Sequence, residues 1–273
     1  MVKHICIILI LITNTATAYA ELRISNGKDM EVRYEWMTAL YSLKDNRVYC
    51  GGSLVYPGSL THSGYILTAA HCVVDKKSGK EREFGITIGI TDYAREVGTR
   101  PNIRRIIPHP QYDGIDYDIA LIEIDPVVIY SVEIIKHELN IIGMNSTVLG
   151  WGYTNRSYPS VLQSAEIPIT DDSKCIKTFG SDDFVSDRMI CADAGDTDSG
   201  KSDTCGGDSG GPALVRIGDT LKLAGIISYG SGVCGKPDTP TVFMRVSAFL
   251  EWIRGYTDED DDGSGCFIQE VWK

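Results

Sequence analysis

Short apolar runs separated by turn residues constrain the fold of this chain more than any other feature. The runs are rich in β-branched and aromatic residues, and glycine and proline, 28 and 10 of the 273 residues, supply turns between them. Such runs at regular spacing are typical of antiparallel barrels rather than of βαβ units. We therefore expect an all-β fold whose strands suit two barrels. The expected strands are residues 48–55, 65–70, 84–91, 102–107, 118–124, 146–151, 164–169, 212–217, 222–229 and 241–246.

One helix is expected near the C-terminal end, at residues 246–253. Val246, Phe249, Leu250 and Ile253 follow an i, i+3, i+4, i+7 pattern, which gives a helix one apolar face. Residues 256–273 differ in kind, with a block of acidic and small residues at 258–265. Like charges in a block repel one another, so we expect a solvated, disordered tail. Its acidic residues lack the spacing of a calcium loop.

Residues 1–20 have the layout of a secretory signal. Basic residues precede an apolar stretch at 5–12, and the segment ends with the small-x-small triplet Ala18-Tyr19-Ala20. The stretch is too short to span a bilayer, and the alternation expected of a buried N-terminal strand is missing. No later segment is apolar enough for a membrane span. We expect a secreted, soluble protein with no membrane partner, in which residues 21–23, ending at Arg23, form a short propeptide.

Secretion places the cysteines in an oxidising compartment, where disulfides form. Cys6 leaves with the signal, and Cys266 stands apart near the C-terminus. The cysteines of the body allow several pairings, and spacing alone does not choose among them. There is no C-x-x-C pair and no close cluster of histidine and cysteine, so we expect no metal. The body cysteines are Cys50, Cys72, Cys175, Cys191, Cys205 and Cys234.

The formal net charge of −11 disfavours a nucleic-acid partner, because no basic patch is available to neutralise phosphates. Sequons for N-glycosylation begin at Asn145 and Asn155, which suits a secreted chain.

The glycine-rich run at residues 203–212 surrounds Ser209 and is either a tight surface turn or a nucleophile loop. The second interpretation requires a base and an acid elsewhere in the chain. His71 follows an apolar run beside Cys72, and Asp118 opens another apolar run, where a charge needs hydrogen bonds. Each residue alone suits a structural role. Together they supply a nucleophile, a base and an orienting acid.

With these residues the sequence closely resembles the chymotrypsin/trypsin family of serine proteases. The resemblance covers residues 24–255. It implies two perpendicular six-stranded β-barrels with the active site between them and a C-terminal helix. The matching motifs are Cys50-Gly51-Gly52-Ser53-Leu54, residues 68–72, Asp118-Ile119-Ala120-Leu121, Gly150-Trp151-Gly152, residues 205–212 and Ser228-Tyr229-Gly230.

The family's catalytic roles carry over to the matching positions. The resemblance implies that Ser209 attacks a peptide carbonyl, that His71 moves the proton, and that Asp118 orients His71, with help from Ser228. The N–H groups of Gly207 and Ser209 would form the oxyanion hole.

The resemblance also implies activation by cleavage and a disulfide framework. Cleavage after Arg23 would free the amine of Ile24 to pair with Asp208. No cofactor is implied, and the chain would act as a monomer on protein or peptide substrates and meet protein protease inhibitors. The implied disulfides are Cys50–Cys72, Cys175–Cys191 and Cys205–Cys234, which leaves Cys266 without a family partner.

The implied primary pocket combines two opposing signals. Asp203, at the position of the pocket floor, favours Arg or Lys side chains. Gly230 matches one glycine of the pocket wall, whereas Thr241 replaces the other and would narrow the pocket, as in elastase-like members. Tyr229 replaces the usual tryptophan of the substrate-facing wall. We expect cleavage after Arg or Lys, with elastase-like specificity or a non-catalytic binding homologue as alternatives. The complete triad disfavours the non-catalytic alternative.

Overall fold

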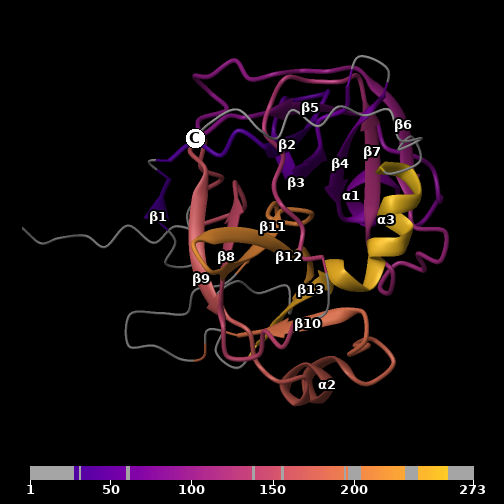
Figure 1. Ribbon diagram of the computed structural model, residues 1–273, viewed down its shortest axis with the longest axis vertical. Helices are drawn as coiled ribbons and strands as arrows, with labels where there is room; N and C mark the ends of the chain where they lie inside the picture. The colour runs from indigo at the N-terminus through magenta and orange to yellow at the C-terminus, as the bar shows by residue number, and fades with distance from the viewer. Residues whose placement is uncertain are drawn as a thin grey trace, which may run out of the picture.

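The computed structural model describes residues 28–30, 32–59, 62–136, 139–154, 157–193, 195, 204–230 and 239–257 (Figure 1). Two antiparallel sheets dominate it, and the expected all-β, trypsin-like fold with a short C-terminal helix is confirmed. Several expectations lie outside the described residues. These are the signal, the propeptide, Arg23, Ile24, Asn155, Asp203, Cys234, Cys266 and the tail beyond residue 257.

The first sheet has six strands in the order β5-β2-β3-β4-β7-β6. Its core includes the fully buried Leu54 on β3, Ile66 on β4 and Ile122 on β7, which the strand register places on one face of the sheet. The strands are β2 (Met37–Ser42), β3 (Val48–Tyr56), β4 (Gly64–Thr68), β5 (Phe84–Ile88), β6 (Ile103–Pro108) and β7 (Ala120–Ile124).

The second sheet has the order β1-β9-β8-β11-β12-β13-β10. It carries one strand more than the six that the family resemblance implies, because the two-residue β1 pairs with the edge of β9. The strands are β1 (Lys28–Asp29), β8 (Asn145–Gly150), β9 (Gln163–Pro168), β10 (Met189–Ala192), β11 (Pro212–Ile217), β12 (Thr220–Tyr229) and β13 (Thr241–Arg245).

The helices correct the sequence-based expectations in three places. The expected helix begins as a 3-10 turn, η1 (Val246–Phe249), and continues as α3 (Leu250–Thr257), so Tyr256 is helical and not part of the tail. The ring of Tyr256 packs edge-on against Trp252 and beneath the guanidinium of Arg105, which explains the extra turn. Two further helices, α1 (Ala70–Val73) and α2 (Ser173–Phe179), were not expected.

The two sheets meet where glycines let their backbones touch. A Cβ atom at Gly51 on β3 would lie 2.9 Å from the Cα of Gly211, just before β11. The N–H of Gly51 also donates to the carbonyl of Ser209 across this junction, at 2.8 Å. Helix α3 follows the second sheet in sequence but lies beside β6 and β7 of the first (Figure 1). The loop that carries Ser209 is therefore fixed where the sheets join.

Among the described residues, no helix combines the length and apolar character needed to cross a membrane.

Candidate active site

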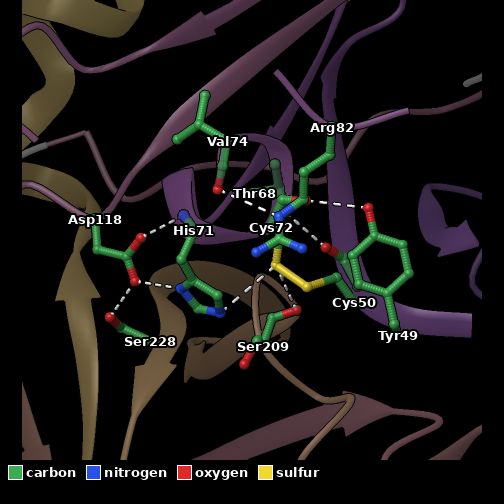
Figure 2. The surroundings of a disulfide bond; sticks show 11 residues. Tyr49, Cys50, Thr68, His71, Cys72, Val74, Arg82, Asp118, Ser209 and Ser228 are labelled. Carbon is green, nitrogen blue, oxygen red and sulfur yellow. Dashed lines mark hydrogen bonds and ion pairs between the residues drawn. A yellow bond between two sulfur atoms is a disulfide. The ribbon is translucent and has the colours of Figure 1, made fainter. Parts of the chain in front are cut away.

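Asp118, His71 and Ser228 form a hydrogen-bonded chain, which Figure 2 shows at its left side. His71 lies in the single-turn helix α1, whereas Asp118 comes two residues before β7. The carboxylate of Asp118 accepts three bonds: from the backbone N–H of His71 at 2.9 Å, from its Nδ1 at 2.7 Å, and from Ser228 Oγ at 2.5 Å. A donor at Nδ1 leaves Nε2 of a neutral His71 as the basic nitrogen.

The surroundings of Asp118 keep its carboxylate ionised. Burial raises its pKa, but the neighbouring His71 and the hydrogen bonds from His71 and Ser228 outweigh that effect, so the pKa lies below its usual value. The side chain of Asp118 is 5% exposed and that of His71 is 32% exposed. A fixed negative charge thus lies behind an imidazole that reaches solvent.

Ser209 occupies a tight loop directly in front of β11. The loop is closed by the N–H of Asp208 to the carbonyl of Cys205 and the N–H of Gly211 to the carbonyl of Asp208, both at 3.0 Å. Within the described part of the chain, no hydrogen bond joins Ser209 Oγ to His71 Nε2, and Nε2 instead contacts Cys72 Sγ at 3.8 Å (Figure 2). Catalytic hydrogen bonds are often long without substrate and shorten when it binds.

A disulfide anchors the helix that carries His71. Cys72 is bonded to Cys50 on β3, and the hydroxyl of Tyr49 donates to the carbonyl of Cys72 at 3.0 Å. Burial raises the pKa of Tyr49 to about 12, so this hydroxyl stays protonated as a donor. The sulfur atoms lie within 4.8 Å of a ring nitrogen of His71, but sulfurs bonded to each other offer no thiolate to a metal.

A second disulfide joins Cys175 on α2 to Cys191 on β10. Both bonds are pairs that the family resemblance implies. Cys205 is also disulfide-bonded, and its expected partner, Cys234, lies outside the described residues.

Asp208 packs against Gly150 and Gly152, two glycines of a family motif whose purpose the sequence alone does not explain. Its side chain is buried, and its carboxylate accepts the N–H of Gly152 at 2.7 Å and that of Cys205 at 2.9 Å. A Cβ atom at Gly150 would lie 2.0 Å from Asp208 Oδ1, and one at Gly152 would lie 2.4 Å from its Cγ. The Gly150-Trp151-Gly152 motif therefore makes room for the Asp208 carboxylate.

Replacing Gly152 with alanine is expected to displace Asp208 and to lower kcat/KM by roughly 100-fold, as a misplacement of about 1 Å can. The new methyl group would overlap the Asp208 carboxylate, so one of the two groups would have to move. Steady-state kinetics on a small ester substrate provide the measurement. Gly206→Ala is the matched control, because a Cβ atom at Gly206 meets nothing within 4 Å. Equal activity of the two variants would contradict this role for the motif.

Two backbone N–H groups beside Ser209 are available to an oxyanion. Within the described ranges, neither Gly207 nor Ser209 donates its N–H to an acceptor. Gly207 has a φ of +107°, which residues with a side chain rarely adopt, and a Cβ atom there would lie 2.9 Å from Gly152 Cα. Unpaired donors in a glycine turn are the usual construction of an oxyanion hole.

A cavity of about 390 Å³ opens next to His71. Tyr229 forms one wall, and its ring packs edge-on against Phe179 with centroids 5.2 Å apart. Burial raises the pKa of Tyr229, whose hydroxyl donates to the carbonyl of Asp183. Ile115, on the loop before β7, also lines the cavity. Tyr229 thus lines a cavity beside His71, and sequence reasoning missed Phe179 and Ile115 because only the fold brings them to the same cavity.

The two expected pocket-wall residues lie together. Thr241, at the start of β13, is buried, and its Oγ1 lies 3.0 Å from that of Thr204. A Cβ atom at Gly230 would lie 3.5 Å from Thr241 Oγ1. The threonine thus occupies space that a glycine would leave open. Asp203, the expected floor, lies outside the described residues.

Comparisons with known proteins agree with this geometry. The family model described as Trypsin matches residues 24–253. The chain is 34% identical over 249 residues to transmembrane protease serine 11B of Homo sapiens, covering 86% of this chain and 56% of that protein. It is 33% identical over 253 residues to transmembrane protease serine 7 of Mus musculus, covering 86% and 28%. Serine proteinase stubble of Drosophila melanogaster is 32% identical over 259 residues, covering 86% and 31%.

The chain spans between 28% and 56% of the length of these three relatives. The matching part contains the hydrogen-bonded Asp118 and His71 and the loop of Ser209. On these findings, the chain belongs to the trypsin family of serine proteases, which are endopeptidase hydrolases.

Proposed function

We propose that this protein is a secreted serine endopeptidase that hydrolyses peptide bonds through an acyl-enzyme on Ser209. The observation that carries the proposal is the hydrogen bond of 2.7 Å between the Asp118 carboxylate and Nδ1 of His71. It fixes the ring so that the other nitrogen can serve as the base. The open N–H groups of Gly207 and Ser209 supply the matching electrostatic site for the oxyanion.

In the proposed reaction, Ser209 Oγ attacks the carbonyl carbon while His71 Nε2 takes its proton. The carbonyl oxygen becomes an oxyanion held by Gly207 and Ser209, each donor contributing about 3–4 kcal/mol to the transition state. The carbon–nitrogen bond then breaks, and His71 returns the proton to the departing amine. Water repeats the sequence on the ester and releases the carboxylic acid. Asp118 stays ionised throughout and stabilises the charged form of His71.

Activation is proposed to follow cleavage after Arg23. The freed amine of Ile24 would then pair with Asp208, whose buried carboxylate already accepts two N–H groups. An amine brought to this carboxylate would be desolvated with it, so losing either partner would leave the other charge uncompensated. The proposed organisation is a signal at 1–20, a propeptide at 21–23, a protease domain from residue 24 to the end of α3 at Thr257, and an acidic tail. The transmembrane character named for the relatives is a property of those proteins.

The proposed substrates are proteins or peptides cleaved after Arg or Lys, with Asp203 as the selecting acid. This assignment of Asp203 rests on the sequence resemblance. Thr241 supports elastase-like specificity as the second candidate, because its buried side chain narrows the space beside Gly230. Glycosylation is proposed at Asn145, which is exposed at the start of β8, and at Asn155.

Replacing Thr241 with glycine is expected to raise kcat/KM for arginine esters by about tenfold relative to alanine esters. Removing the side chain widens the pocket for the long arginine side chain and removes a surface that the small alanine side chain would contact. Paired measurements on both esters check the ratio. Thr241→Ser keeps the hydroxyl and removes only the methyl group. It therefore shows whether the methyl or the hydroxyl group of Thr241 narrows the substrate pocket. An unchanged ratio in the glycine variant would mean that Thr241 does not restrict the pocket.

The proposed function is tested with the protein cleaved after Arg23 and a panel of Arg, Lys, Ala and Phe esters. Turnover of the arginine and lysine esters is expected. Turnover of alanine esters alone would replace the basic preference with elastase-like specificity. No turnover of any ester by the cleaved protein would sink the enzyme proposal and favour a non-catalytic binding homologue.

A further inference from the structure

We propose that Arg188 is a positioning residue that clamps Asp116 and Tyr117 and thereby keeps Asp118 in line with His71. The inference rests on the proposed serine-protease function. Arg188 directly precedes β10 of the second sheet, and Asp116 lies on the loop that leads into β7 of the first. The clamp therefore joins the two sheets just upstream of Asp118.

The first observation is a two-point ion pair. Arg188 Nε donates to Asp116 Oδ1 at 3.1 Å, and its NH2 group donates to Oδ2 at 2.5 Å. The two side chains are only 27% and 15% exposed, so solvent screens this pair less than a surface pair. Bidentate arginine–carboxylate contacts fix direction as well as distance. The ion pair thus holds the loop in one orientation relative to the second sheet.

The second observation is an aromatic residue held in a rare backbone conformation. Tyr117 has a φ of +53°, and among the described residues only Asn46 shares a positive φ without being glycine. Such a conformation is unfavourable for a residue with a side chain and persists only when the surroundings impose it. The guanidinium of Arg188 lies 4.5 Å from the centre of the Tyr117 ring. The ring of His109 stacks on Tyr117 as well, with centroids 4.7 Å apart.

The third observation links this conformation to the catalytic carboxylate. The N–H of Tyr117 donates to Asp116 Oδ1 at 2.8 Å, and the carbonyl of Tyr117 accepts the N–H of Ile119 at 2.7 Å. Asp118 lies between these two fixed points. The backbone angles of Tyr117 therefore set the direction in which the Asp118 side chain leaves the chain. Arg188 contacts both groups that fix these angles, the carboxylate of Asp116 and the ring of Tyr117.

An arginine is required for this arrangement. Lysine carries the same charge but has neither the fork that meets both carboxylate oxygens nor the planar group that lies over a ring. An ordinary partly exposed ion pair would add little stability and would leave the catalytic rate unchanged. If Arg188 positions Asp118, its replacement should lower kcat; if it only stabilises the fold, kcat of the folded variant should not change.

The test compares Arg188→Gln and Arg188→Lys with Arg105→Gln. Arg105 is a matched control, because it too pairs with a carboxylate, Glu123, and lies over a tyrosine ring, Tyr256, but it belongs to β6, an edge strand of the first sheet. With a small arginine ester, Arg188→Gln is expected to lower kcat by about 10- to 100-fold with little change in KM. Arg188→Lys should recover only part of that loss, and Arg105→Gln should match the wild type.

A proton NMR measurement on the full chain provides a readout that does not need turnover. The resonance of the proton between His71 Nδ1 and Asp118 should shift upfield and exchange faster in Arg188→Gln, but not in Arg105→Gln. Near-ultraviolet circular dichroism establishes that each variant is folded. If Arg188→Gln fails to fold, Arg188→Lys decides between the two outcomes.

An unchanged kcat together with an unchanged resonance would overturn the positioning role. A rise in KM alone would also overturn it, because the pair would then shape only the substrate groove. Failure of the wild type to turn over any ester would sink the proposed function. The NMR comparison would still decide the clamp.

Discussion

Replacing Ser209 with alanine will lower kcat by about a million-fold, and substrate binding will change little. The magnitude is that known for removal of the nucleophile from a serine protease with this triad. Alanine lacks the oxygen that forms the acyl-enzyme, whereas the pocket beside Tyr229 and the N–H groups of the loop remain in place. The residual rate should be the part that binding and oxyanion stabilisation supply without a nucleophile.

The measurement is single-turnover and steady-state hydrolysis of an arginine ester by the cleaved protein. Ser131→Ala, at an exposed serine that does not line the cavity beside His71, serves as the control and should retain wild-type rates. A Ser209→Ala variant within tenfold of the wild type would show that another residue is the nucleophile.

Replacing Asp118 with asparagine will lower kcat by about 10⁴-fold, the loss known for the type member of this family. The asparagine amide can fill the same space, but it removes the negative charge that stabilises the cation of His71 as Ser209 gives up its proton. Its amide group can also present a donor to Nδ1 of His71, which would favour the wrong tautomer. The N–H of His71 and the hydroxyl of Ser228 would lose an anionic acceptor.

The control is Asp125→Asn, which also removes a carboxylate with a pKa held below its usual value, there by Asn102 and Arg104. Asp125 follows the opposite end of β7 from Asp118 and its side chain is 37% exposed, so its variant should keep full activity. Initial rates at pH 8 compare the two variants directly. Equal rates for Asp118→Asn and the wild type would remove Asp118 from the mechanism.

Much of the fold was predictable because many of its strands have a composition typical of β-structure. The runs that became β3, β11 and β12 are rich in valine, isoleucine and leucine between turn residues, and they were expected within a few positions. The strand β2 was missed because it mixes Met, Thr and Ala and buries four successive residues, which hides the period of two. The four-residue β10 is also buried throughout.

The helix α1 was missed for a related reason. An apolar run continues through residues 65–70 into His71, so the sequence offered no boundary between strand and helix. In the structure the strand β4 ends at Thr68, and the chain turns at Ala69 to place His71 beside Asp118. The disulfide Cys50–Cys72 then anchors that turn.

In the site, too, residues within motifs could be predicted from the sequence, whereas residues brought together only by the fold could not. His71, Asp118 and Ser209 could be chosen because their neighbours match known motifs, and His71 and Asp118 are hydrogen-bonded in the structure. The packing of Asp208 against Gly152 and Gly150 could not be foreseen, since these glycines are 56 and 58 residues away in the sequence. Arg188 was not predicted either, because 72 residues separate it from Asp116 and no local pattern marks the pair.

Labelling with a fluorophosphonate reagent tests the central claim most directly. The reagent reacts only with a serine whose hydroxyl is activated by a correctly oriented base. With protein cleaved after Arg23, mass spectrometry should find one phosphonyl group per chain, on the peptide that contains Ser209. Asp118→Asn should slow the labelling strongly, and Ser209→Ala should abolish it. Labelling on a different residue, or no labelling of the cleaved wild type, would contradict a nucleophilic Ser209 activated by His71 and Asp118.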